Sequence, residues 1–418
     1  MADKFFPINT DTACKLKWAW STIRLYTGKT SSCHRVNSSL VDTNSTTFDF
    51  HNTPKQLADR QLMLEGKWPT GGCEYCKNIE DVGGTSDRMM HLKIPNQVPV
   101  ELDTDINAVR VSPTIIEVYL DNVCNMGCLY CWDGFSSKIQ QENIQFGEFS
   151  HSGVEIKNRA VVNPDHATLK TKFWEWLDLN CSTLERLNIL GGEPFYQQDF
   201  AVCMDFLDNR SNPNLEFNVV SNLNIKHDKF KNIILEIKKL VDAKKIKRFD
   251  LTASIDCFGK EQEYVRYGLD LELWKKNFEF LVNEKWIVLN VNQTITGLTI
   301  KTMSPLVDYI NLHRENRDIG HYFSAVVDTH KCLEPGIFGK DFFKEEFDNI
   351  LAAMKTDTVW NQTHQSYMQG IYTQLNSIER DQEKINQLEI FLNEIDRRRG
   401  LDWKQTFPWL VKEIKNVA

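Results

Sequence analysis

The chain has 418 residues, of which 41% are hydrophobic and 25% charged, and its formal net charge at pH 7 is −8. This balance is typical of a folded globular protein, and the length exceeds that of one ordinary compact domain. The negative charge disfavours non-specific nucleic-acid binding. No segment reaches the roughly 20 apolar residues that span a bilayer, and the first residues lack the apolar core of a signal peptide. We therefore expect a cytoplasmic protein without a membrane or nucleic-acid partner.

Eleven cysteines are many for a cytoplasmic protein, because the reducing cytosol disfavours structural disulfides. Metal ligands, redox groups and buried hydrophobic residues are the alternatives, and the spacing must decide among them. The first group comprises Cys14, Cys33, Cys73 and Cys76, in a region rich in Thr, Ser, Asn and Gly with little periodic apolar pattern. Such a region buries little core of its own, so a metal centre would stabilise it.

From about Pro113 onwards, short apolar runs alternate with helical patterns. Strands are expected at 114–120, 186–190, 216–220, 248–255, 287–294 and 322–327. Helices are expected at 168–178, 199–209, 230–241, 271–283, 303–312, 340–354 and 382–398, and the charged residues of 378–398 are interpreted as a solvated face. Residues 133–164 are interpreted as an insertion after the first of these strands. The alternation predicts an α/β fold with a parallel sheet curved into a partial (β/α)6 TIM-like barrel.

We accordingly expect three parts. An N-terminal cysteine-rich module covers residues 1–110, the partial barrel covers 111–334, and a helical C-terminal extension covers 335–418.

The first barrel strand leads directly into a loop with the spacing C-x3-C-x2-C, formed by Cys124, Cys128 and Cys131. Three thiolates at this spacing can wrap one face of an iron–sulfur cubane and leave the fourth iron without a protein ligand. Gly127 permits the tight loop. A zinc knuckle is the alternative, but structural zinc sites use four ligands, usually as two short pairs.

The segment Cys124-Asn-Met-Gly-Cys128-Leu-Tyr130-Cys131 resembles the signature loop of the radical S-adenosylmethionine (SAM) superfamily. The resemblance implies a [4Fe–4S] cluster whose free iron chelates SAM, with Tyr130 beside the adenine. It also implies reductive cleavage of SAM to methionine and a 5′-deoxyadenosyl radical, which abstracts a hydrogen atom from the substrate.

Several residues at later strand ends occupy positions where this family contacts SAM. Gly191, Gly192, Glu193 and Pro194 resemble the motif that binds the SAM amino group. Ser221, Asn222, Ser254, Asp256 and Arg266 match further contact positions, and Asn292 and Gln293 are additional candidates. Catalytic groups of βα barrels gather at the C-terminal ends of the strands. Ordinary turn or cap residues are the alternative interpretation for Ser221, Asn222, Ser254, Asp256 and Arg266.

The first cysteine group has the spacing C-x13-G-x4-C from Cys14 through Gly28 to Cys33, followed by the pair Cys73 and Cys76. This pattern resembles SPASM and twitch auxiliary-cluster modules, which usually follow the barrel but here precede it. The resemblance implies a second, auxiliary [4Fe–4S] cluster. Four thiolates also suit tetrahedral zinc.

The remaining cysteines have no ligand spacing. Cys181 and Cys203 are expected to be buried hydrophobic residues, whereas Cys257 is a candidate hydrogen-atom or proton donor. We expect a radical SAM enzyme that modifies a peptide or protein side chain and receives electrons from a flavodoxin or ferredoxin. Oxidation or rearrangement of a small carbohydrate or nucleotide is one alternative, and a non-catalytic iron–sulfur or zinc scaffold is another.

Overall fold

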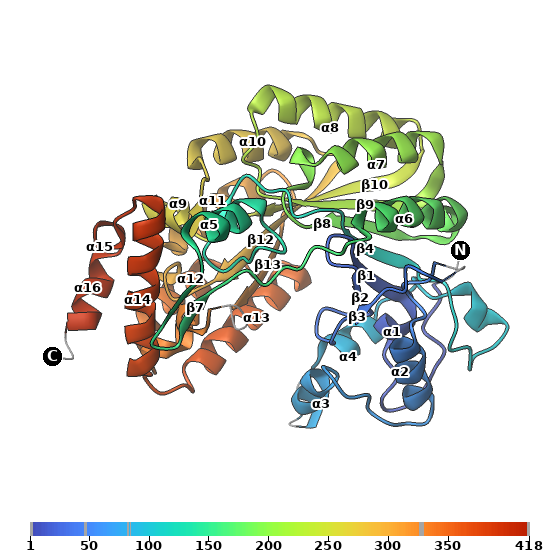
Figure 1. Ribbon diagram of the computed structural model, residues 1–418, viewed down its shortest axis with the longest axis horizontal. Coiled ribbons are helices and arrows are strands. Elements are labelled where there is room, and N and C mark those ends of the chain that lie inside the picture. Colours follow the sequence, from blue (N-terminus) through green and yellow to red (C-terminus); the bar gives the residue numbers. More distant parts are fainter. Residues whose placement is uncertain (1–2, 46–47, 82, 84, 326–329, 416–418) are drawn as a thin grey trace. The chain divides into compact units, whose positions relative to one another are not determined.

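A computed structural model describes residues 3–45, 48–81, 83, 85–325 and 330–415 (Figure 1). The chain forms two compact units. The first comprises Met1–Asp121, Val161–Val219 and Glu236–Phe249, and the second comprises Asn122–Ala160, Val220–Leu235 and Asp250–Ala418. Within the described residues, no helix combines the length and the apolar character that crossing a bilayer requires.

The first unit contains a mostly parallel sheet. Its strands are β9 (Asn212–Ser221), β8 (Arg186–Leu190), β4 (Ile115–Tyr119), β1 (Trp20–Arg24), β2 (Lys29–Ser31) and β3 (Ser39–Leu40), in this spatial order. The first four run parallel, and the last two add in antiparallel fashion. Four of the five β4 residues are buried, because a strand inside a parallel sheet is covered on both faces. Helices α6 (His166–Asn180) and α7 (Gln198–Asn209) lie along this part of the sheet (Figure 1).

The N-terminal residues of the first unit add to this sheet. The sequence analysis places the first strand at 114–120, yet β1 pairs with β4 in parallel, with Ile23 opposite Val118. Only five residues form β1, and its mixed polar sequence lacks the apolar pattern that would have revealed it. Helices α1 (Lys15–Ala19), α2 (Pro54–Leu64) and α4 (Asp87–Leu92) pack near β1, and α3 (Glu74–Asp81) follows Cys73. A small core formed around Trp18 and Met63 includes Cys14 and Cys73.

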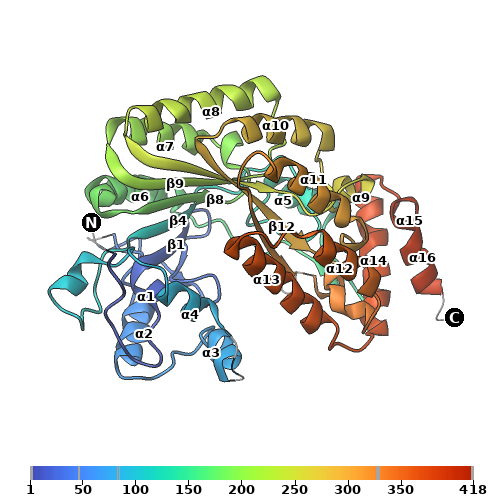
Figure 2. The same ribbon diagram turned by 180° about the vertical axis from the view of Figure 1, so that it is seen from behind.

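The second unit combines strands with most of the helices. It contains the second half of β10 (Ile246–Ser254) and the parallel pair β12 (Ile287–Ile295) and β13 (Gly320–Ala325). Helix α10 (Leu271–Asn283) precedes β12, α11 (Ser304–Arg314) lies between β12 and β13, and α12 (Lys344–Ala353) and α13 (Val359–Leu375) follow β13. Helix α12 packs against α11 and α13 (Figure 2), and α13 also packs against β13. The predicted insertion forms α5 (Ser137–Phe146) and the hairpin of β6 (Phe149–His151) and β7 (Val154–Ile156).

The predicted strands and helices are confirmed within a few residues at their ends. They include α8 (His227–Asp242), which runs across the boundary between the units, and α14 (Gln382–Arg399). Positions 326–327 of the last predicted strand lie outside the described residues. The result is a mixed α/β chain with a large, mostly parallel sheet.

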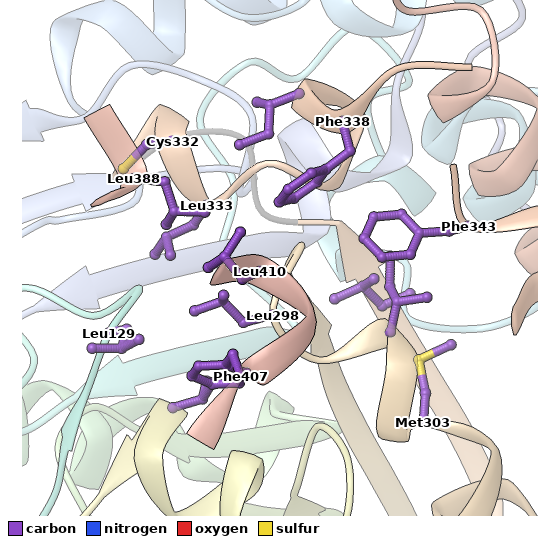
Figure 3. Close-up of a cluster of buried hydrophobic side chains, with 14 of the residues drawn as sticks. Leu129, Leu298, Met303, Cys332, Leu333, Phe338, Phe343, Leu388, Phe407 and Leu410 are labelled. Atoms are coloured by element: carbon purple, nitrogen blue, oxygen red, sulfur yellow. The ribbon is translucent and has the colours of Figure 1, made fainter. Parts of the chain in front are cut away.

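One hydrophobic core joins distant parts of the second unit. Leu129 from the cysteine loop shares this core with Leu298 and Leu333 and with Phe407 and Leu410 near the C-terminal end (Figure 3). The last two lie on or beside α15 (Trp403–Thr406) and α16 (Pro408–Lys415). Residues after 335 therefore help to build the core beneath the cysteine loop.

Candidate functional site

Backbone pairing anchors the middle of the cysteine loop. Strand β5 (Gly127–Cys128) pairs with β11 (Arg266–Tyr267), with Cys128 opposite Arg266. The next amide, that of Leu129, donates to the Val265 carbonyl at 2.8 Å. The Leu129 side chain is 2% exposed, so the loop is fixed by its backbone on one side and by apolar packing on the other.

Side chains fix the beginning of the same loop. The Cys124 amide donates to Ser137 Oγ at 3.1 Å. Asn125 Nδ2 donates to the Asn224 carbonyl at 2.9 Å, and Asn222 Nδ2 donates to Asn125 Oδ1 at 2.8 Å. Asn222, a predicted SAM contact, is thus hydrogen-bonded to the cysteine loop.

The three loop thiols influence one another. Burial raises the pKa of Cys131, and the neighbouring thiols Cys128 and Cys124 raise it further. Burial also raises the pKa of Cys128, while Arg266 and Arg399 lower it. In the part of the chain that the structure describes, no three or more His, Cys, Asp or Glu side chains are grouped as metal ligands. The donor chemistry, three thiols close together in the sequence with Arg266 and Arg399 near Cys128, suits an anionic iron–sulfur cluster.

Tyr130, Asp256 and Arg266 form one hydrogen-bonded network at the loop, in which Asp256 and Arg266 are buried and Tyr130 is half-buried. Tyr130 Oη donates to Asp256 Oδ2 at 2.7 Å, and Arg266 donates through Nε and Nη2 to the two carboxylate oxygens at 2.8 and 2.7 Å. The Asp256 side chain is fully buried and that of Arg266 is 7% exposed. Although burial opposes the charge of Arg266, Asp256 and Tyr130 hold its pKa well above the usual value. Burial raises the pKa of Tyr130, so its hydroxyl remains a donor.

The network is supported from two further strands and a helix. Gln262 Oε1 accepts from the amides of Asp256 and Cys257 at 3.1 and 2.8 Å. Gln293 donates to the Asp256 carbonyl and accepts from His321 Nε2 at 2.9 Å. The sequence analysis missed Gln262 and His321, since neither belongs to a motif. Gln262 is flanked by Glu261 and Glu263, whereas His321 precedes the apolar run of its strand.

Three other predicted site residues occupy buried positions at strand ends. Ser254 ends β10 and is 8% exposed. Ser221 ends β9, and its Oγ accepts from the Leu223 amide at 3.0 Å. Cys257 is fully buried, and burial raises the pKa of its thiol, so the thiol is protonated at neutral pH.

Helix α14 contacts the cysteine loop through its last residue, Arg399. Arg399 Nη1 donates to the Gly127 carbonyl at 2.8 Å, and its Nε donates to Glu142 Oε2 at 2.8 Å. The Arg398 side chain is fully buried, and Glu394, which pairs with it, is 6% exposed. The predicted solvated face over 378–398 is therefore wrong at these positions, because the i, i+4 ion pair allows both charges to be buried.

The Gly191–Pro194 segment belongs to the first unit. Gly191 has φ +82°, and a Cβ there would lie 2.7 Å from the Tyr119 ring, so glycine is required by both conformation and space. Gly192 also has a positive φ, of 57°. Glu193 is fully buried and accepts from the Phe195 amide at 3.3 Å. The segment presents backbone and carboxylate groups within a tightly constrained turn.

The N-terminal cysteines also lie in the first unit. Burial raises the pKa of Cys14 to about 12, and the Cys33 thiol contributes to the increase. Burial likewise raises the pKa of Cys33 and of Cys73, while Lys17 lowers both. Lys17 Nζ donates to Asp59 Oδ2 at 2.6 Å and is almost completely buried. The sequence analysis missed this buried cation, whose charge lowers the pKa of the Cys14, Cys33 and Cys73 thiols against the effect of burial.

None of the eleven cysteines, all of which are described, forms a disulfide. Cys181 and Cys203 are buried, as expected for hydrophobic residues.

Comparisons with known proteins give only distant matches. No protein-family model matches the chain, and no curated protein is similar to it. Among solved structures, the chain is similar to Streptococcus suis SuiB (14% identity, TM-score 0.35, covering 61% of this chain and 50% of SuiB). It is also similar to anSMEcpe with bound AdoMet, at 13% identity and TM-score 0.33, covering 62% of this chain and 62% of anSMEcpe. A third similar structure is TYW1 with a lysine-pyruvate adduct bound, at 13% identity and TM-score 0.28, covering 55% of this chain and 68% of TYW1. The similarity thus spans half of SuiB, and at these scores it does not establish a shared fold.

Proposed function

We propose that the chain is a radical SAM enzyme that binds a [4Fe–4S] cluster through Cys124, Cys128 and Cys131. The observation that carries the proposal is the cysteine loop itself. Its three cysteines have C-x3-C-x2-C spacing, and β11 and the Tyr130–Asp256–Arg266 network hold the loop in place. When bound, such a cluster would supply one electron to SAM, whose carbon–sulfur bond would break to give methionine and the 5′-deoxyadenosyl radical. The protein's task is to bind, orient and shield these cofactors.

The chain's own residues have distinct roles in this proposal. The hydrogen bond to Asp256 fixes the ring orientation of Tyr130, which would lie beside the adenine. Arg266 compensates the buried Asp256 charge and lies 5.6 Å from the Tyr130 ring centroid. Gly191, Gly192 and Glu193 would hold the SAM amino group through backbone carbonyls and a carboxylate. Ser221, Asn222 and Ser254 would provide further polar contacts.

We also propose an auxiliary [4Fe–4S] cluster on Cys14, Cys33, Cys73 and Cys76, within a SPASM/twitch-like module. Support comes from the spacing of these residues, from the mutual influence of the Cys14, Cys33 and Cys73 thiols, and from buried Lys17. Zinc is the alternative metal, because four thiolates suit it equally well. With four protein ligands the cluster would transfer electrons or support the fold.

The proposed substrate is a peptide or protein side chain, and the proposed reductant is a flavodoxin or ferredoxin of the cytoplasm. Peptides and sugars or nucleotides labelled with deuterium distinguish the substrate classes. Transfer of the label from a peptide into 5′-deoxyadenosine supports the proposal. Transfer only from sugars or nucleotides overturns this part of it.

Reductive cleavage of SAM tests the activity. Anaerobically reconstituted wild type, mixed with dithionite and SAM, should form 5′-deoxyadenosine, and Cys128→Ala should form none. Cys203→Ala is the matched control, since Cys203 is buried without ligand spacing, and it should retain the activity. Absence of cleavage by wild type that holds an intact cluster would leave the iron–sulfur scaffold as the better description.

A further inference from the structure

Arg399 lies at the last residue of α14, yet its side chain is only 3% exposed. Its guanidinium group donates to the carbonyl of Gly127, the residue immediately before Cys128, at 2.8 Å. The same group forms a two-pronged ion pair with Glu142 of α5, with distances of 2.8 and 3.3 Å. The Arg399 side chain therefore connects α14 to α5 and to the backbone of the cysteine loop.

The ring of Tyr267 provides a second contact surface for Arg399. The Arg399 guanidinium carbon lies 4.8 Å from the ring centroid, and Lys138 Nζ lies 4.5 Å from it. Tyr267 is the backbone partner of Gly127 in the β5–β11 pair. A Cβ at Gly127 would lie 3.3 Å from Arg399 Nη2, so the glycine leaves space for this close approach.

The neighbouring arginines do not share this role. Arg397 pairs with Glu394, and its side chain is 56% exposed. Arg398 donates to Glu394, to Asn143 and to the Gly147 carbonyl. Of the three consecutive arginines, Arg399 alone bonds to the cysteine loop, so a general preference for cations at a helix C-terminus does not account for its position.

We propose that Arg399 is a positioning residue for the cysteine loop and that its charge raises the reduction potential of the cluster bound there. The inference rests on the proposed function. A cluster with thiolate ligands is anionic and becomes more negative on reduction, so a fixed, buried cation favours the reduced state. Glu142, on the other side of the ion pair, has the opposite charge and opposes this effect.

The sign of the potential shift separates charge from structure. Arg399→Gln and Glu142→Gln both break the same ion pair, so a purely structural role would change both variants in the same direction. The proposal requires opposite shifts: a more negative midpoint potential for Arg399→Gln and a more positive one for Glu142→Gln. The measurement is an anaerobic redox titration of each reconstituted protein followed by EPR, with Arg397→Gln as a control on the same helix that should match wild type.

The positioning role has its own readout, the rate at which a chelator removes iron from the oxidised protein. Arg399→Gln should lose iron several-fold faster than wild type, and Arg399→Lys should restore the potential but only part of the iron retention, since lysine keeps the charge and lacks the planar fork. Equal potentials and equal rates in Arg399→Gln and Arg397→Gln would overturn the inference and leave the radical SAM proposal standing. A wild type that binds no iron would overturn both.

Discussion

The buried carboxylate of Asp256 connects Tyr130 of the cysteine loop to Arg266 of β11. It accepts hydrogen bonds from Tyr130, from Arg266 and from the Thr294 amide at 2.9 Å. A buried ion pair contributes little relative to a well-packed apolar pair, but removing one partner leaves an uncompensated charge in the interior. Sequence position alone indicated Asp256 and Arg266 as site residues, but their direct pairing depends on the fold.

Asp256→Asn should therefore lower the free energy of unfolding by about 3 to 5 kcal/mol, because Arg266 loses its charged partner. Urea unfolding followed by fluorescence measures the change. Asp242→Asn is the matched control: it breaks the exposed i, i+4 pair with Lys238 and should cost about 0.3 to 0.5 kcal/mol. A cost below about 1 kcal/mol for Asp256→Asn would contradict the importance assigned to this network.

His321 should make stability depend on pH. Burial, with Arg314 and His364 nearby, lowers its pKa from 6.5 to about 3. Above pH 6.5 the ring is neutral whether the chain is folded or unfolded. Between pH 6.5 and about 3 the unfolded chain takes up a proton that the folded protein excludes. The free energy of unfolding therefore falls by up to about 1.4 kcal/mol for each unit by which the pH is lowered.

Unfolding by urea from pH 7 to 4 measures this slope. His321→Gln should reduce the slope, since glutamine does not titrate, whereas His151→Gln, at an exposed position, should leave it unchanged. Identical slopes for wild type and His321→Gln would show that His321 does not control the acid side of the stability curve.

At the scale of elements, the helices after residue 381 complete the environment of the cysteine loop. Periodicity predicted α14, because its apolar residues recur at helical spacing, and short apolar runs likewise predicted the strands of the large sheet from β4 onwards. Periodicity did not predict β1, which is short and polar, nor the burial of Arg398 and Arg399, since a charged residue in a helix is usually solvated. The partners of these side chains explain their positions: Arg398 pairs with Glu394 of the same helix, and Arg399 pairs with Glu142 and the Gly127 carbonyl of other elements.

Phe407→Ala should lower the free energy of unfolding by about 3 to 5 kcal/mol, the usual cost of removing a buried aromatic ring. The ring is fully buried and contacts the Tyr264 ring edge to face, with centroids 5.2 Å apart. The measurement is chemical denaturation, and Leu312→Ala, at a side chain 59% exposed, is the control expected to change stability by less than about 0.5 kcal/mol. Equal effects of the two substitutions would indicate that the C-terminal helices contribute no essential packing.

At the scale of the whole molecule, the two cysteine groups belong to different compact units with separate hydrophobic cores. The expected boundaries at residues 110 and 334 remain predictions. Both cysteine groups could be identified from spacing, because ligand spacing is local in sequence. The metal that the N-terminal group would bind under this proposal could not, because four thiolates suit both zinc and iron–sulfur clusters.

The two proposed clusters should consequently be lost independently. Wild type should contain about eight irons, because each cubane cluster holds four iron atoms. The Cys124/Cys128/Cys131→Ala variant and the Cys14/Cys33/Cys73/Cys76→Ala variant should each contain about four. Anaerobic iron and sulfide quantitation measures this. About four irons in wild type and none in the first variant would assign zinc or no metal to the N-terminal group.

The contact between Arg399 and the Gly127 carbonyl also has a consequence for biosynthesis. Cys131 and Arg399 are 268 residues apart in the sequence, which corresponds to roughly 13 to 54 s of translation at typical rates. Throughout that interval the nascent chain presents three thiols without the helix that secures their loop. For the proposed cluster, delivery of iron and sulfide would therefore be best timed after synthesis of nearly the whole polypeptide. Oxidation of the loop thiols before that time is the hazard that this order of events would create.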